Sequence, residues 1–143
     1  MAKLSDKNSM QEAYSNVRND TVDMNWLVLG YKDNEIVLED TGTDFSEFAS
    51  KFSDDERKYG FLRVVAGDEL SKRAKFALIQ WLGHNVSAIK RARMATDKAV
   101  VKEVIRDFAK EFLFSEKSEL NEDKIITEVK KAGGANYGTG SRD

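Results

Sequence analysis

The sequence contains no cysteine and no proline, and it has a single histidine among 143 residues. Without cysteine the chain can form no disulfide, no thiolate metal site and no cysteine nucleophile. No apolar run approaches the ~18 residues that a membrane-spanning helix needs. The first residues, Met1 to Lys7, also lack the apolar core of a signal peptide. These absences favour a cytosolic protein.

Catalytic signals are also scarce. The only histidine, His84, lies in a Gly-His-Asn turn, and no serine-centred GxSxG motif accompanies it. Carboxylates fall at helix starts, turns and helix surfaces, without an HExxH or EF-hand pattern. We therefore expect His84 to be an exposed loop residue. The sequence predicts a binding protein rather than an enzyme, with no cofactor and no metal site.

Hydrophobic residues make up 41% and charged residues 34% of the chain, which is typical of one globular α+β domain with a sizeable core. Helical spacing of apolar residues predicts four helices, at residues 9–18, 44–52, 86–108 and 120–132. Branched and aromatic runs predict strands at residues 24–31, 35–39, 59–66, 74–82 and 111–115. The strand at 74–82 is apolar on both faces and should be central, with helices on both sides. In the long helix we expect an inward stripe of Ile89, Ala92, Val100, Val104 and Phe108.

Positive charge is concentrated in one part of the chain. Residues 67–107 contain nine Lys and Arg against five Asp and Glu, so this part has a net charge of +4 and the remainder −6. Such segregation predicts a single basic surface, formed by the turn, the start of the strand at 74–82 and the long helix. This surface favours an acidic partner, although basic patches are often only solvated surface. Nucleic acid and anionic lipid would also suit these cations. The strands lack the aromatic signature of RNA-recognition domains, however, so we expect no nucleic acid and no membrane partner.

Several stretches of the chain have a distinctive sequence, namely residues 71–83 (SKRAKFALIQWLG), 85–87, 96–98, 101–104, 108–112 and 130–137 (KKAGGANY). They resemble the coactosins and animal coactosin-like proteins, a single-domain branch of the ADF-homology (cofilin-like) fold family. The resemblance covers essentially the whole chain. It implies an ADF-homology domain over residues 1–135 with a mixed sheet of five or six strands between helices, followed by a flexible tail over 136–143.

The resemblance further implies binding to filamentous actin, little affinity for monomers, no severing or depolymerisation, and opposition to the capping of barbed ends. Lys75 matches the lysine that matters most in the S-K-R-x-K-F motif of the family, and Lys72 and Arg73 match its neighbours. The actin-gripping start of the long helix corresponds to residues 89–94, although one more residue separates the cations here. The actin-binding residues expected on this helix are Lys90, Arg91, Arg93, Met94, Lys98 and Lys102. Met94 would supply an apolar anchor between the charges.

A second partner is an alternative from a different class. Vertebrate coactosin-like proteins are associated with 5-lipoxygenase, so the chain would then act as a cytosolic scaffold or chaperone, with Lys130 and Lys131 as contacts. On either interpretation we expect a monomer in the cytoplasm. Association with the cytoskeleton would follow from actin binding.

Overall fold

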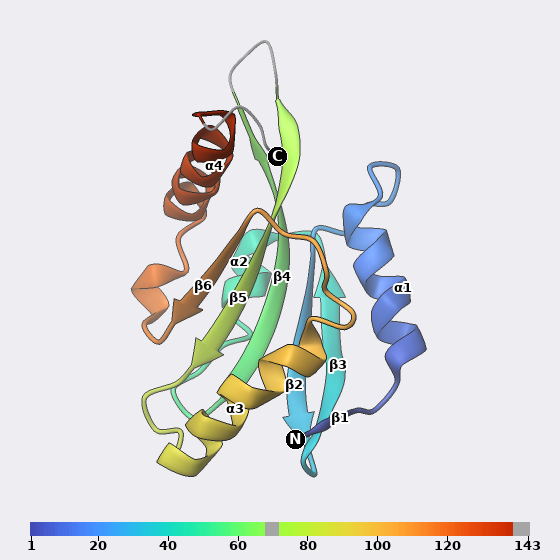
Figure 1. Cartoon of the computed structure of the whole chain (residues 1–143), viewed down its shortest axis with the longest axis vertical. Coiled ribbons are helices and arrows are strands. Elements are labelled where there is room, and N and C mark those ends of the chain that lie inside the picture. Colours follow the sequence, from blue (N-terminus) through green and yellow to red (C-terminus); the bar gives the residue numbers. More distant parts are fainter. Residues whose placement is uncertain (68–71, 139–143) are drawn as a thin grey trace.

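Six strands form one mixed sheet, in a computed structural model that describes residues 1–67 and 72–138 (Figure 1). The strands are β1 (Lys3–Leu4), β2 (Trp26–Lys32), β3 (Glu35–Gly42), β4 (Arg57–Ala66), β5 (Arg73–Leu82) and β6 (Lys110–Phe114). Their order across the sheet is β1-β3-β2-β4-β5-β6. The four inner strands pair antiparallel, while β1 and β6 pair parallel to their neighbours at the two edges. The predicted mixed sheet of an α+β domain is confirmed.

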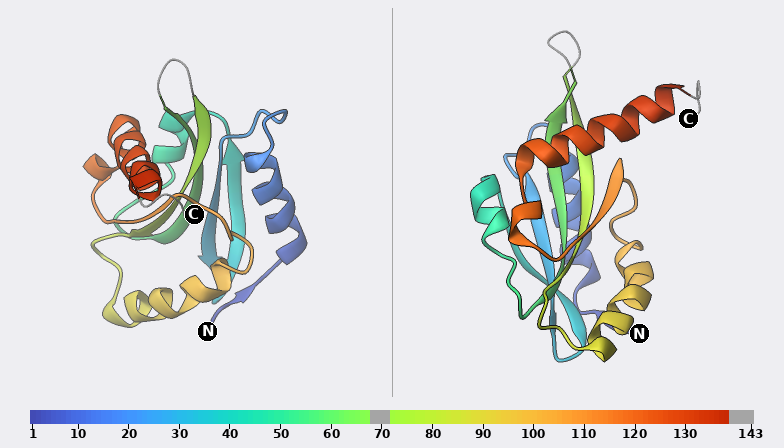
Figure 2. Two further views of the ribbon diagram at one scale, coloured as in Figure 1. Left: turned by 45° about the horizontal axis from the view of Figure 1, so that its top comes forward. Right: turned by 90° about the vertical axis from the view of Figure 1, so that its left-hand side faces the viewer.

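Helices cover both faces of this sheet (Figure 2). They are α1 (Lys7–Arg18), α2 (Phe45–Ala49), α3 (Ala88–Val101), α4 (Glu122–Gly138) and the 3-10 helix η1 (Lys117–Glu119). One core cluster joins α1 and α3 to the sheet, and a second joins α2 and α4 to the opposite face. No helix within residues 1–67 and 72–138 is long and apolar enough to cross a membrane.

β5 is an inner strand whose side chains enter both cores, as its two apolar faces predict. Leu78 belongs to the core under α1 and α3, whereas Ile79 and Trp81 belong to the core under α2 and α4. All three are fully buried, and Phe76 is half-buried. Alternation along the strand therefore fixes which side chains each helix layer covers.

Two local features depend on special backbone positions. Asp33 and Asn34 both have positive φ, at 53° and 65°, and they form the two-residue turn between β2 and β3. Gly60 allows α2 to approach the sheet, since a Cβ there would lie 2.7 Å from the Phe48 ring. The turn joins β2 directly to β3, and Gly60 lets α2 pack against β4.

The long helix differs from the prediction in length and in orientation. α3 ends at Val101, and Val104 and Ile105 reach the core from the turns that follow it. Ile89 is 65% exposed and Ala92 is exposed, so the predicted inward stripe is wrong at these two positions. The inward residues of α3 are Met94, Asp97, Val100 and Val101. A pattern search for apolar residues misses this face because its middle member is a carboxylate.

The chain ends also differ from expectation. β1 is too short to produce a periodic signal, yet it adds a sixth strand beside β3. α1 begins two residues earlier than predicted, because Asp6 rather than Ser9 caps it by accepting a hydrogen bond from the Ser9 backbone N–H. α4 continues past the expected stop at Gly133 to Gly138, into the range predicted as a tail. The remaining tail residues, 139–143, lie outside the described residues.

Candidate functional site

Three cations gather where the β4–β5 pairing begins. We call Lys72, Arg73 and Lys75 the hairpin cluster. Lys72 and Arg73 are exposed and Lys75 is half-buried. Lys75 lies opposite the buried Val64 on β4, so its methylene stem can cover apolar surface while its ammonium reaches solvent. Asp68 and Glu69, the acidic residues that precede this cluster in the sequence, lie outside the described residues.

The start of α3 carries the second predicted group of cations, which the structure divides by role. Lys90 and Arg93 are exposed. Arg91 instead points back at the loop before the helix, where its Nε donates to the Val86 carbonyl at 3.0 Å and its Nη2 to the Gly83 carbonyl at 2.8 Å. Arg91 therefore holds the β5–α3 loop, and contact with a partner stays a prediction for it.

Lys98 and Lys102, near the end of α3, both pair with Glu111 on β6. The ammonium-to-carboxylate distances are 2.6 and 2.9 Å. Burial alone would raise the pKa of the Glu111 carboxyl, but hydrogen bonds from the two lysines bring that pKa below its ordinary value. The pairs fix α3 against the sheet, and they engage two of the cations that we expected to face a partner.

Met94 cannot be a surface anchor, so this prediction is wrong. Its side chain is fully buried in the core beneath α3, and its carbonyl accepts a hydrogen bond from the Tyr59 hydroxyl at 2.7 Å. The register of the helix turns Met94 inward and leaves Ile89, one and a half turns earlier, largely exposed. Ile89 is therefore a large apolar side chain of α3 that is available to a partner.

Sequence reasoning also missed the outer surface of α3, because it assigned Ile89 and Ala92 to the interior. This surface, which we call the α3 face, consists of Ile89, Ala92, Ala95, Thr96 and Ala99. All five are exposed. Small residues let another backbone approach the helix closely, and Lys90 and Arg93 lie on the same exposed end. The only sequence signal was the i, i+3, i+7 spacing, which is shared by buried and docking faces alike.

The hairpin cluster and the α3 face lie at opposite ends of the molecule (Figure 1). β5 connects these ends, and a ten-residue strand spans about 30 Å. Lys130 and Lys131, by contrast, lie on α4, which packs at the end of the sheet that bears the hairpin cluster (Figures 1 and 2). Both are exposed, and Lys131 pairs with Glu128 at 3.3 Å. The predicted single basic surface is thus two separate surfaces.

A family model for cofilin/tropomyosin-type actin-binding proteins matches residues 2–130 of this chain. The chain belongs to this family. Human coactosin-like protein is 47% identical over 137 residues, which cover 96% of each chain. A crystal structure of the human protein superposes with a TM-score of 0.87 at 44% identity, over 92% of this chain and 99% of the human one.

Mouse coactosin, an actin filament binding protein, is a further relative within the family. Its solution structure matches with a TM-score of 0.78 at 46% identity, over 99% of this chain and all of the mouse chain. These matches confirm the predicted ADF-homology fold and the resemblance to coactosins. Members of this family are actin-binding proteins rather than enzymes, in agreement with the scarcity of catalytic signals.

The single histidine lies beside a carboxylate. His84 is exposed as predicted, and its Nε2 lies 2.6 Å from a carboxylate oxygen of Glu116, which is itself largely exposed. Among residues 1–67 and 72–138, no three His, Asp or Glu side chains come together as metal ligands do. The His84–Glu116 pair joins the β5–α3 loop to the segment before η1.

Proposed function

We propose that this protein is a coactosin-type protein that binds actin filaments. The observation that carries the proposal is the pair of separated surfaces, the hairpin cluster and the α3 face, on a chain 46% identical to mouse coactosin. Two surfaces about 30 Å apart can contact two neighbouring subunits of a polymer at once. A free monomer offers only one subunit, so linked contacts favour the filament.

The residues divide into those that contact actin and those that hold the contacting surface. On the hairpin cluster, Lys75 is the principal contact, with Lys72 and Arg73 beside it. On α3 the contacts are Lys90, Arg93 and the α3 face. Partly desolvated ammonium and guanidinium groups would pair there with actin carboxylates, while Ile89 supplies apolar contact.

Four other predicted residues act from within the fold. Arg91 orders the loop before α3, and Lys98 and Lys102 fix the helix through Glu111. Met94 sets the depth at which the helix packs. Each would influence actin binding through the position of α3.

The family resemblance also favours binding without severing or depolymerisation, with opposition to barbed-end capping. Time-resolved imaging of labelled filaments tests this part of the proposal. We expect filament length and the monomer fraction to stay constant when the protein is added. Frequent breaks at sites where the protein is bound would instead make it a severing protein.

A second candidate partner is a cytosolic enzyme such as 5-lipoxygenase. It is favoured by the exposed pair Lys130 and Lys131 on α4. We expect the protein to be a cytoplasmic, cytoskeleton-associated monomer in both cases. Charge-reversed Lys130→Glu and Lys131→Glu variants should lose 5-lipoxygenase in a pull-down if that scaffold function exists.

Co-sedimentation with actin filaments tests the central proposal. All interactions through these cations weaken with salt, so salt dependence alone does not identify the partner. The titration should therefore include RNA or anionic vesicles as competitors at constant ionic strength. We expect saturable pelleting with filaments that neither competitor abolishes. Failure to pellet, or full displacement by RNA, would contradict the proposal.

A further inference from the structure

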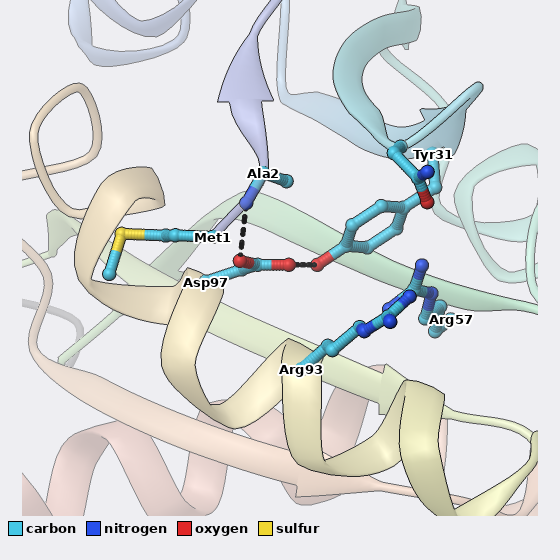
Figure 3. A pocket seen from close by; sticks show the side chains of 7 residues that line it. Met1, Ala2, Tyr31, Arg57, Arg93 and Asp97 are labelled. Atoms are coloured by element: carbon cyan, nitrogen blue, oxygen red, sulfur yellow. Dashed lines mark hydrogen bonds between the residues drawn. The ribbon is translucent and has the colours of Figure 1, made fainter.

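A pocket of about 300 Å³ lies between α3, the start of β4, the β2–β3 turn and the first residues of the chain (Figure 3). Two guanidinium groups reach it, one from Arg57 on β4 and one from Arg93 on α3. The other polar side chains that line it are Tyr31, Asn34 and Asp97. Two cations that share one small pocket repel each other unless an anion lies between or beside them.

Asp97, the carboxylate in the pocket lining, is engaged elsewhere. Its Oδ1 accepts a hydrogen bond from the Ala2 backbone N–H and its Oδ2 accepts one from the Tyr31 hydroxyl, both at 2.8 Å. Figure 3 shows these two bonds and none from Asp97 to an arginine. Burial raises the pKa of Tyr31, so the phenol stays protonated and keeps donating to this carboxylate. Asp97 therefore has both oxygens occupied by donors other than the two guanidinium groups.

Arg57 is held in place before any ligand arrives. Its guanidinium carbon lies 3.7 Å from the centroid of the Tyr31 ring, and its Nη1 donates to the Lys90 carbonyl at 3.1 Å. Stacking on an aromatic ring and a single backbone bond leave most of the five N–H groups of the fork available. Arg93 reaches the pocket from α3 and is an exposed residue. One fork is therefore preorganised and the second is free to adjust.

We propose that this pocket binds a phosphate group carried by a small soluble molecule. Arginine forks match the paired oxygens of a phosphate, and two forks suit an oxyanion with two negative charges. The lining residues Arg57, Arg93 and Asp97 together have a net charge of +1, so the pocket attracts an anion. Its volume of about 300 Å³ and its position between α3, β4 and the β2–β3 turn suit a small soluble molecule that enters the pocket. The site lies apart from the hairpin cluster, but it shares Arg93 with the proposed actin contacts on α3.

An NMR titration of the full chain with inorganic phosphate and with pyrophosphate tests the site. Ionic strength is held constant with sodium chloride, so general screening does not change. We expect saturable shifts of the amide signals of Tyr31, Asn34 and Arg93. Because charge-assisted bonds are lost, Arg57→Gln and Arg93→Gln should each weaken the affinity about tenfold or more. Arg106→Gln removes the same charge from an exposed position on another segment and should bind as the parent does.

Arg93→Gln changes an exposed side chain, so the test does not depend on whether Arg57→Gln folds. Shifts that fail to saturate would overturn the proposal, as would equal losses in Arg106→Gln and Arg93→Gln. Pelleting with vesicles of phosphatidylcholine and phosphatidic acid tests whether the pocket binds a lipid phosphate instead. If Arg93→Gln reduces pelleting with these vesicles but leaves phosphate and pyrophosphate binding intact, the soluble-ligand assignment is wrong.

Discussion

Leu78 is the residue on which the placement of β5 depends most directly. It is fully buried in the core beneath α1 and α3 and pairs across the sheet with Phe61. Leu78→Ala should lower the free energy of unfolding by about 2–5 kcal/mol, because it leaves a cavity in a packed core. Chemical denaturation measures this loss. A variant as stable as the parent would contradict the packing described for β5.

The lowered pKa of Glu111 leads to a prediction about how stability depends on pH. Because its folded-state pKa is lowered, ionised Glu111 stabilises the fold above the ordinary glutamate pKa of about 4.3. That contribution is lost as the pH falls from there through the lowered pKa of the folded protein. Glu111→Gln should therefore be less stable than the parent at pH 7, by up to about 1 kcal/mol for partly exposed pairs.

The stability difference between Glu111→Gln and the parent should shrink as the pH drops below about 4. Denaturation midpoints at pH 7, 5 and 3 provide the measurement. Arg106→Gln, which affects a cation without an ion pair to a described carboxylate, is the control. A difference that stays constant over this range would show that the two lysine pairs do not stabilise the folded chain.

Among the elements, α3 shows best what sequence can and cannot predict. Its cations and its start were predictable, since Ser87 caps it and Lys90 follows in the first turn. Its buried face was not, because Asp97 occupies an inward position that only Ala2 and Tyr31, distant in sequence, can satisfy. The strands of the sheet were easier to predict, since β5 has two apolar faces and the Asp33-Asn34 turn has characteristic residues.

The exposed position of Ile89 leads to a prediction for α3. Ile89→Ala should weaken filament binding by about 1–2 kcal/mol, roughly five- to thirty-fold, because an apolar contact with actin is lost. The melting temperature should hardly change, since Ile89 is 65% exposed in the free protein. Leu113→Ala on β6, where the leucine is 60% exposed, is the matched control and should bind normally. Equal affinity of Ile89→Ala and Leu113→Ala would exclude the α3 face as a contact.

At the scale of the whole molecule, the two surfaces at opposite ends of β5 distinguish this account from that of a single basic patch. The sequence predicted the cations on both surfaces but not their separation, because their distance depends on the length and direction of β5 in the sheet. It also could not show that Arg91, Lys98 and Lys102 bind partners within the chain. These partners lie on a loop and on β6, and only the folded topology brings them together.

The most direct test is one co-sedimentation titration of the parent and Lys75→Gln with filaments, with monomer binding measured in parallel. Glutamine keeps the inner half of the methylene stem that lies opposite Val64 and removes the charge, so circular dichroism and melting temperature should match those of the parent. Truncating one member of a desolvated charge pair costs roughly 2–5 kcal/mol, so filament affinity should fall about 30-fold or more. We predict tight filament binding by the parent, its loss in folded Lys75→Gln, and weak monomer binding by both. Normal filament binding by folded Lys75→Gln, or equal affinity of the parent for monomers and filaments, would contradict the account.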